Sequence, residues 1–181
     1  FSDSYWAAPS KLFGEIARLG FEPVLSGPWQ VPGDVLSPLP TLLVLTGGGS
    51  VGENPLRDDF ERKLIDESIS KGIPILGLCR GTQLLASFFG SDLVGIEGHV
   101  ACDKTIVVRG LGKGTVTCYH NDVLNKVPSG FNLFAESEDG FVEGIIHKSL
   151  RILGVQWHPE REEDSSPFST VPILKLALGL V

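Results

Sequence analysis

The feature that most constrains this chain is a strand that must turn directly into a helix, with a cysteine at the turn. The run from Ile73 to Leu78 is apolar and rich in β-branched residues, which is typical of a buried strand. Apolar side chains then recur at helical spacing from Thr82 to Phe89. The intervening Gly77-Leu78-Cys79-Arg80-Gly81 leaves no room for a loop. Glycines suit such a turn because neighbouring backbone leaves no space for side chains. The pattern therefore predicts a G-x-C-x-G elbow with a nucleophile at its centre.

The position of Cys79 favours a reactive thiolate, because the positive end of a helix dipole lies at the helix N-terminus. The amides of Arg80 and Gly81 would point towards negative charge developing on a bound carbonyl oxygen. A free cysteine is more often only a small buried hydrophobe. A second motif, Gly154-Val155-Gln156-Trp157-His158-Pro159-Glu160, favours the catalytic interpretation. Side chains two apart share one face of an extended chain, so Glu160 can orient the His158 imidazole.

Together these two motifs resemble the class I glutamine amidotransferase superfamily, whose triad is Cys-His-Glu. The resemblance implies that Cys79 is the nucleophile, that His158 is the base and acid, and that Glu160 orients His158. A glycine loop, Gly47-Gly48-Gly49, follows the apolar strand predicted from Thr41 to Thr46. The resemblance implies that the amide of Gly47 or Gly48 forms the oxyanion hole with the Arg80 amide.

The same resemblance suggests substrate contacts. Gln83, one helical turn after the cysteine, resembles the family residue that contacts the glutamyl group. Tyr119 and His120 resemble a polar turn that borders the substrate pocket, although His120 fits an ordinary surface turn equally well. His99 resembles a family position near the cleft.

Other residues bear on the branch of the superfamily. The pattern R-D-x-F-E-x-x-L-I from Arg57 to Ile65, together with Arg80, resembles the γ-glutamyl-γ-aminobutyrate hydrolases. The run 86–90, A-S-F-F-G, resembles hydrolases of γ-glutamyl-CDP-amidates. Arg80 would either contact a charged leaving group or pair with an acid such as Glu61. Most other charges between Arg57 and Ile69 are expected to form a solvated helix face.

We therefore predict that the protein hydrolyses a γ-glutamyl amide to glutamate and an amine through a cysteinyl thioester. The alternative is a glutaminase subunit that delivers ammonia to a synthase partner. Neither reaction needs a metal or an organic cofactor, and none is expected. A homodimer is also compatible with the sequence.

The chain is expected to form a single domain over residues 1–181. The predicted fold class is α/β, with a doubly wound, mostly parallel sheet, a flavodoxin-like core and a small antiparallel β-ribbon. Tyr5 to Leu19 is predicted to be a helix. Because family members place a strand before this helix, an N-terminal strand is expected to be missing from the sequence.

Composition limits the partners and the compartment. The formal charge of −7 argues against nucleic acid or an anionic membrane as the main partner. The longest apolar stretches are strand-length, so no membrane span is predicted. The three cysteines, Cys79, Cys102 and Cys118, lack C-x-x-C spacing. This favours free thiols in a reducing, cytoplasmic compartment over disulfides or a zinc site.

Overall fold

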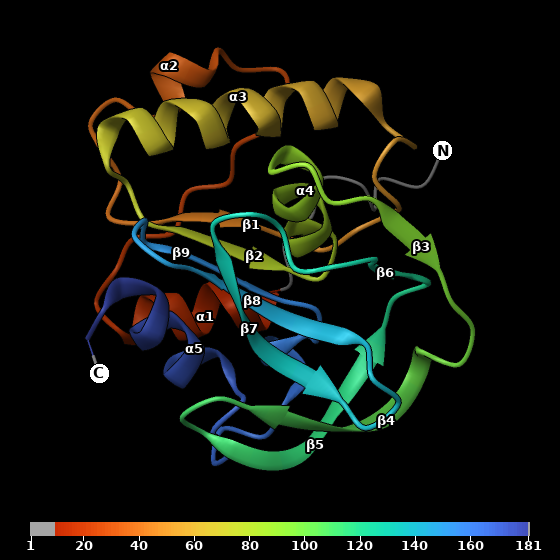
Figure 1. Cartoon of the computed structure of the whole chain (residues 1–181). Coiled ribbons are helices and arrows are strands. Elements are labelled where there is room, and N and C mark those ends of the chain that lie inside the picture. Colours follow the sequence, from red (N-terminus) through yellow and green to blue (C-terminus); the bar gives the residue numbers. More distant parts are fainter. Residues whose placement is uncertain (1–9, 181) are drawn as a thin grey trace.

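The structure, a computed structural model, describes residues 10–180 and combines one curled mixed sheet with helices on both of its faces (Figure 1). The helices are α1 (Ser10–Arg18), α2 (Pro32–Val35), α3 (Pro55–Lys71), α4 (Arg80–Phe88) and α5 (Thr170–Leu178), with a short 3₁₀ turn η2 (Pro159–Arg161). The strands are β1 (Leu43–Leu45), β2 (Ile75–Leu78), β3 (Leu93–Gly95), β4 (Val100–Val108), β5 (Gly112–Tyr119), β6 (Asp122–Leu124), β7 (Phe131–Ser137), β8 (Val142–His147) and β9 (Ile152–Val155).

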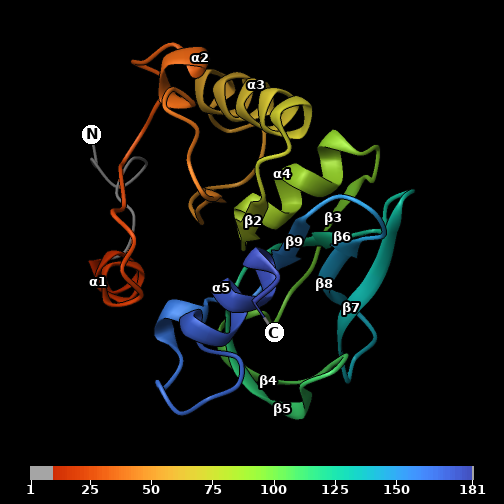
Figure 2. The same ribbon diagram turned by 90° about the vertical axis from the view of Figure 1, so that its left-hand side faces the viewer.

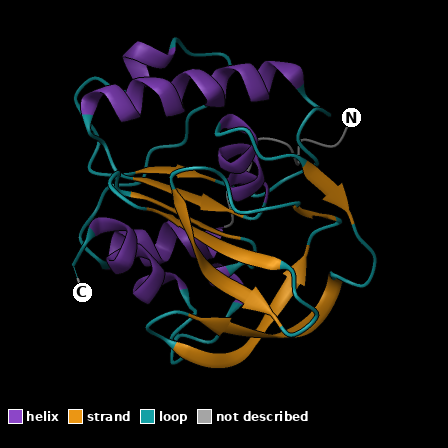
Figure 3. Ribbon diagram, in the orientation of Figure 1, coloured by secondary structure: helices purple, strands orange, loops and turns teal. Residues whose placement is uncertain are grey.

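Within residues 10–180 the sheet has nine strands, and its main path runs β1-β2-β9-β8-β7-β4-β5. The pairs β1–β2 and β2–β9 are parallel, and the other pairs of the described chain are antiparallel. Strand β3 pairs with β6, which also pairs with β8. Figures 2 and 3 show the sheet curling so that β4 and β5 lie at one end, beyond β7 and β8.

The predicted α/β class is confirmed, but the expectation of a mostly parallel, flavodoxin-like sheet is not. Parallel neighbours need a crossover connection, usually a helix, and α4 is the last helix before β9. The later strands follow one another through short turns and therefore pair antiparallel. The expected small ribbon is also not a separate unit, because β4 pairs with both β5 and β7.

Helix α3 begins and ends where its sequence signals indicate. The side chain of Asn54 accepts a hydrogen bond from the Arg57 amide (3.2 Å), and Pro55 follows in the first turn. Gly72 ends the helix in the left-handed conformation, with φ of 68°. Helix α1 lies within the predicted segment from Tyr5 to Leu19, of which residues 5–9 are outside the described part of the chain.

The alternating side chains of β2 build two cores, one on each face of the sheet. Leu76 and Leu78 pack with residues of α1 and α5. Ile75 packs on the opposite face with residues of α3 and α4. A strand buried on both faces reads as a continuous apolar run, which explains the pattern from Ile73 to Leu78. This burial fixes the strand that carries the elbow. Across residues 10–180, no helix combines the length and the apolar character that crossing a membrane requires.

Candidate active site

Cys79 lies at the turn between β2 and α4, as the glycine pattern predicts. Its backbone is strained, with φ of 50° and ψ of −109°, a conformation that non-glycine residues rarely adopt. The Cys79 amide donates a hydrogen bond to the Val155 carbonyl (2.8 Å), which also accepts one from the Thr82 hydroxyl (2.7 Å). One carbonyl of β9 therefore holds both sides of the elbow.

The two glycines of the elbow are required by close packing. A Cβ on Gly77 would lie 2.8 Å from the backbone of Gly81 and Thr82. A Cβ on Gly81 would overlap the carbonyl of Leu45 in β1. Larger residues at either position would push α4 away from the sheet, and the thiol would move with it.

Strand β9 brings His158 to the same place. Leu78 and Val155 are paired in the parallel register of β2 and β9, and each is followed within three residues by a reactive side chain. His158 Nδ1 lies 2.6 Å from Glu160 Oε1, so the carboxylate orients the ring. The other side of the imidazole interacts with the Cys79 thiol.

These contacts set the protonation of His158. Burial lowers the pKa of its imidazole, but the hydrogen bonds and charges of Cys79 and Glu160 outweigh burial and raise the pKa to about 9. The arrangement favours a protonated imidazole beside the Cys79 thiol at neutral pH. Such a pair supplies both a nucleophile and a proton donor.

The glycine loop after β1 faces this pair. A Cβ on Gly47 would lie 3.0 Å from His158 Cε1 and 3.7 Å from Cys79 Cβ. A side chain at position 47 would therefore crowd the imidazole, which would have to shift by a few tenths of an ångström. Gly48 has φ of 152°. Whether Gly47, Gly48 or the Arg80 amide binds an oxyanion stays a prediction.

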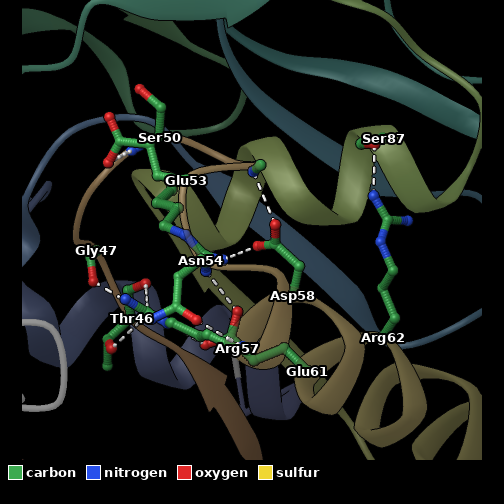
Figure 4. A network of polar contacts seen from close by, with 12 residues as sticks. Thr46, Gly47, Ser50, Glu53, Asn54, Arg57, Asp58, Glu61, Arg62 and Ser87 are labelled. Atoms are coloured by element: carbon green, nitrogen blue, oxygen red, sulfur yellow. Dashed lines mark hydrogen bonds and ion pairs between the residues drawn. The ribbon is translucent and has the colours of Figure 1, made fainter.

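A buried polar network holds this loop from behind (Figure 4). Arg57 Nη2 donates to the carbonyls of Thr46 (3.0 Å) and Gly47 (3.2 Å), and its Nε binds Glu61 (2.7 Å). Asp58 accepts a hydrogen bond from the Gly52 amide (2.7 Å). The network positions the loop through α3.

The Arg80 guanidinium belongs to the same network. It forms ion pairs with Asp58 and Glu61, and its side chain is only 2% exposed. The sequence left two interpretations of Arg80 open, and the structure shows the pairing with Glu61. The side chain therefore gives no support to a hydrolase with a charged leaving group.

The sequence offered only one pair of this network, Arg80 with Glu61, as an alternative. Most other charges of α3 were expected on a solvated face, yet Arg57 and Asp58 are buried together with Glu61. Arg57 and Glu61 are four residues apart, and Ile65 of the apolar core follows four residues later. This shared helix stripe was the available signal.

The predicted substrate residues differ in their surroundings. Gln83 is buried, and its Nε2 donates to the Asp122 carbonyl (2.9 Å), which also accepts from Gln156 (3.1 Å). Tyr119 is 39% exposed, and its ring meets the His158 ring edge to face, with centroids 5.9 Å apart. The guanidinium of Arg161, which sequence analysis missed, lies 3.9 Å over the Tyr119 ring. Their roles with substrate stay predictions.

His120 and His99 are not at the surface. Both are buried, with rings 5.1 Å apart, beside Glu143. The prediction that His120 contacts substrate is untested, but its ring lies in an interior cluster.

Comparisons with known proteins show which proteins this chain resembles. The family model described as "Glutamine amidotransferase class-I" matches residues 26–172. The chain is 30% identical over 145 residues to the γ-glutamyl-CDP-amidate hydrolase of Campylobacter jejuni, covering 77% of this chain and 70% of that protein. It is 35% identical over 135 residues to a subunit of the glutamine-hydrolysing GMP synthase of Methanosarcina acetivorans, covering 70% and 68%.

A solved structure is also similar. A protein of Thermoplasma acidophilum, described as belonging to a GMP synthase, matches with a TM-score of 0.82 and 27% identity. The match covers 98% of this chain and 90% of that one. The chain spans 63% of another curated relative, described as a "putative glutamine amidotransferase" of Mycobacterium tuberculosis.

Proposed function

The chain belongs to the class-I glutamine amidotransferase family, and on that premise we propose that it hydrolyses γ-glutamyl amides through a cysteinyl thioester. The observation that carries the proposal is the strained Cys79 at the start of α4, beside a His158 whose ring is held by Glu160. An activated nucleophile requires a base beside it and a third group that orients the base, and Cys79, His158 and Glu160 are arranged in this way.

In the first half of the reaction, the Cys79 thiolate attacks the γ-carbonyl carbon and a C–S bond forms. The carbonyl electron pair moves to oxygen, where the amides of Arg80 and Gly47 or Gly48 would stabilise the charge. Each such donor is worth about 10²–10³ in rate. The His158 imidazolium then protonates the leaving nitrogen, the C–N bond breaks, and the amine departs.

In the second half, neutral His158 removes a proton from water, and the resulting hydroxide attacks the thioester carbon. The C–S bond breaks, glutamate leaves, and the Cys79 thiolate is regenerated beside the His158 imidazolium. Glu160 stays ionised and keeps the imidazole in the required tautomer through its contact with Nδ1 (2.6 Å).

The preferred substrate is a γ-glutamyl amide whose leaving amine carries negative charge. Support comes from the similarity to a γ-glutamyl-CDP-amidate hydrolase and from Arg161, which is exposed on the Tyr119 ring next to His158. Within the described part of the chain, we propose Arg161 instead of the buried Arg80 as a cation that would meet a phosphate or carboxylate on the leaving amine.

A glutaminase subunit that delivers ammonia to a synthase is the second candidate. The observation in its favour is the similarity to GMP synthase proteins in both sequence and structure. In that case turnover of glutamine alone would be low and would rise with the synthase present.

The test is an assay of the purified protein against glutamine and a panel of neutral and anionic γ-glutamyl amines, with glutamate as the common product. Activity should be greatest with the anionic amides, and Arg161→Gln should raise KM for these while leaving glutamine hydrolysis unchanged. Cys79→Ala should abolish turnover, and Cys102→Ser, which removes another thiol, should not. Turnover by Cys79→Ala would refute the mechanism. Exclusive use of glutamine would favour the second candidate.

A further inference from the structure

A second cluster of reactive side chains lies inside the curled part of the sheet, apart from the Cys79–His158 pair. It consists of His99, Cys118, His120 and Glu143, whose potential ligand atoms all lie within 4.8 Å of one another. His99 precedes β4, Cys118 and His120 come from the end of β5, and Glu143 comes from β8. Each residue is at most 3% exposed.

The polar atoms of this cluster lack adequate partners. Ten buried side-chain nitrogen and oxygen atoms of the described residues have no hydrogen bond, and five of them belong to His99, His120 and Glu143. Both carboxylate oxygens of Glu143 and both ring nitrogens of His120 are among them. Leaving a buried polar atom without a hydrogen bond is costly, so five such atoms in one cluster need a ligand or a proton to explain them.

From this geometry we propose that His99, Cys118, His120 and Glu143 form a closed, structural Zn²⁺ site. The donor set contains two imidazoles, a thiolate and a carboxylate, which are the ligands that zinc takes in proteins. The sulfur argues against Mg²⁺ and Ca²⁺, which prefer oxygen ligands. Four protein ligands leave no open position, so the ion would be structural.

The spacing of the atoms fits the proposal. Tetrahedral zinc bonds of about 2.0–2.3 Å place neighbouring ligand atoms about 3.3–3.8 Å apart. His99 Nδ1 lies 3.4 Å from Glu143 Oε1, and His120 Nε2 lies 3.5 Å from Glu143 Oε2. These two distances involve different oxygens of Glu143, and the four ligand atoms lie within 4.8 Å of one another, so the side chains must draw together by up to about 1 Å to share one ion.

An outer carboxylate orients one of the ligands. His99 Nε2 lies 3.0 Å from Asp139 Oδ2, which also accepts from Lys104 (2.7 Å). A donor proton on Nε2 leaves the lone pair of Nδ1 facing the cluster. Zinc-binding histidines commonly have this arrangement, with the second nitrogen on a carboxylate.

The sequence argued against zinc because the cysteines lack C-x-x-C spacing. The structure changes that judgement, since the ligands lie far apart in the chain and are brought together by the curl of the sheet. In the sheet, β7 lies between β8 and β4, so the β4–β5 pair forms no backbone hydrogen bonds with β8. The ion would connect the β4–β5 pair directly to β8.

The test uses the full chain with Cys79→Ala, so that the Cys79–His158 pair cannot bind the metal. Because the cluster is buried, the protein is unfolded with a chelator and refolded with either Zn²⁺ or chelator, then desalted. Refolding with zinc should give about one bound zinc per chain and a higher melting temperature. Refolding with Co²⁺ should give a thiolate-to-cobalt charge-transfer band.

Matched variants in this background locate the metal. Cys118→Ser and Glu143→Gln should lose the bound zinc, and Cys118→Ser should lose the charge-transfer band. Cys102→Ser is the control, because Cys102 pairs with Cys118 in the β4–β5 register but is not in the cluster. It should retain both zinc and band.

A milder variant covers the chance that the buried replacements do not fold. Asp139 is 38% exposed in its side chain, so Asp139→Asn should fold and still bind zinc, but with affinity reduced about 10–100-fold. The proposal is overturned if refolded Cys79→Ala holds no zinc, if zinc leaves its melting temperature unchanged, or if folded Cys118→Ser keeps the metal. Unchanged affinity in Asp139→Asn would also contradict the role given to His99.

Discussion

The strongest test of the buried network is Arg80→Leu. The substitution removes the cation shared by Asp58 and Glu61 and leaves both carboxylates in the interior. Removing one partner of a buried ion pair typically costs about 3–5 kcal/mol of unfolding free energy. Here each acid keeps another partner, since Asp58 accepts from the Gly52 amide (2.7 Å) and Glu61 binds Arg57 (2.7 Å). The lower end, about 3 kcal/mol, is therefore expected.

Arg62→Leu is the matched control. Arg62 also joins α3 to α4, but through one hydrogen bond to the Ser87 hydroxyl (2.8 Å) at a partly buried position. Its loss should cost about 0.5–1.5 kcal/mol. Urea unfolding of the wild type and both variants gives the comparison, provided that the m-values agree. The stability of Arg80→Lys should lie between those of the wild type and Arg80→Leu, because one ammonium group cannot bind two carboxylates as the planar guanidinium group does.

The reasoning would be refuted if Arg80→Leu were no less stable than Arg62→Leu. Stability equal to the wild type, combined with selective loss of activity towards anionic γ-glutamyl amides, would instead place the Arg80 guanidinium at the substrate.

Three further predictions concern the elbow and the thiols. Gly81→Ala should destabilise the protein by about 1–3 kcal/mol in urea unfolding, because the new methyl group overlaps a carbonyl of β1. Gly14→Ala is the control and should stabilise the protein by about 0.5–1 kcal/mol, because Gly14 has open space around it in α1. Equal effects of the two substitutions would exclude close packing as the reason for a glycine at position 81. In metal-free protein, iodoacetamide labelling followed by mass spectrometry should modify Cys79 faster than Cys118, because burial and the nearby Glu143 carboxylate raise the pKa of the Cys118 thiol. The reverse order would contradict the activation of Cys79. The pKa of His158 is raised from 6.5 to about 9 in the folded protein. The stability of the wild type relative to His158→Gln should therefore be greatest below pH 6.5 and should fall as the pH rises through about 9. A stability difference that does not change with pH would contradict the charged interaction of His158 with Glu160.

Local sequence signals predicted the elbow and the strand that carries it. The run from Ile73 to Leu78 could be read because burial on both faces leaves few polar positions. The approach of Gly77 to Gly81 was likewise implied by the absence of a loop. These features depend on residues that are neighbours in the chain, which is why the pattern alone contains them.

Features that depend on distant residues were not predictable in the same way. The buried state of Arg80 depends on Asp58 and Glu61, which lie on α3, and on the packing of α3 against α4. The curl of the sheet, which gathers His99 and Glu143 from separate strands, follows from pairing between β4 and β7. Charge and spacing in a single stretch do not encode such long-range contacts.

The shared Val155 carbonyl has a consequence for motion at the site. Since it accepts from the Cys79 amide and from the Thr82 hydroxyl, the elbow cannot shift relative to β9 without breaking both bonds. His158 follows the same strand within three residues, so we expect the thiol and the imidazole to move together. We therefore expect their alignment to be lost only when the centre of the sheet opens, late in unfolding.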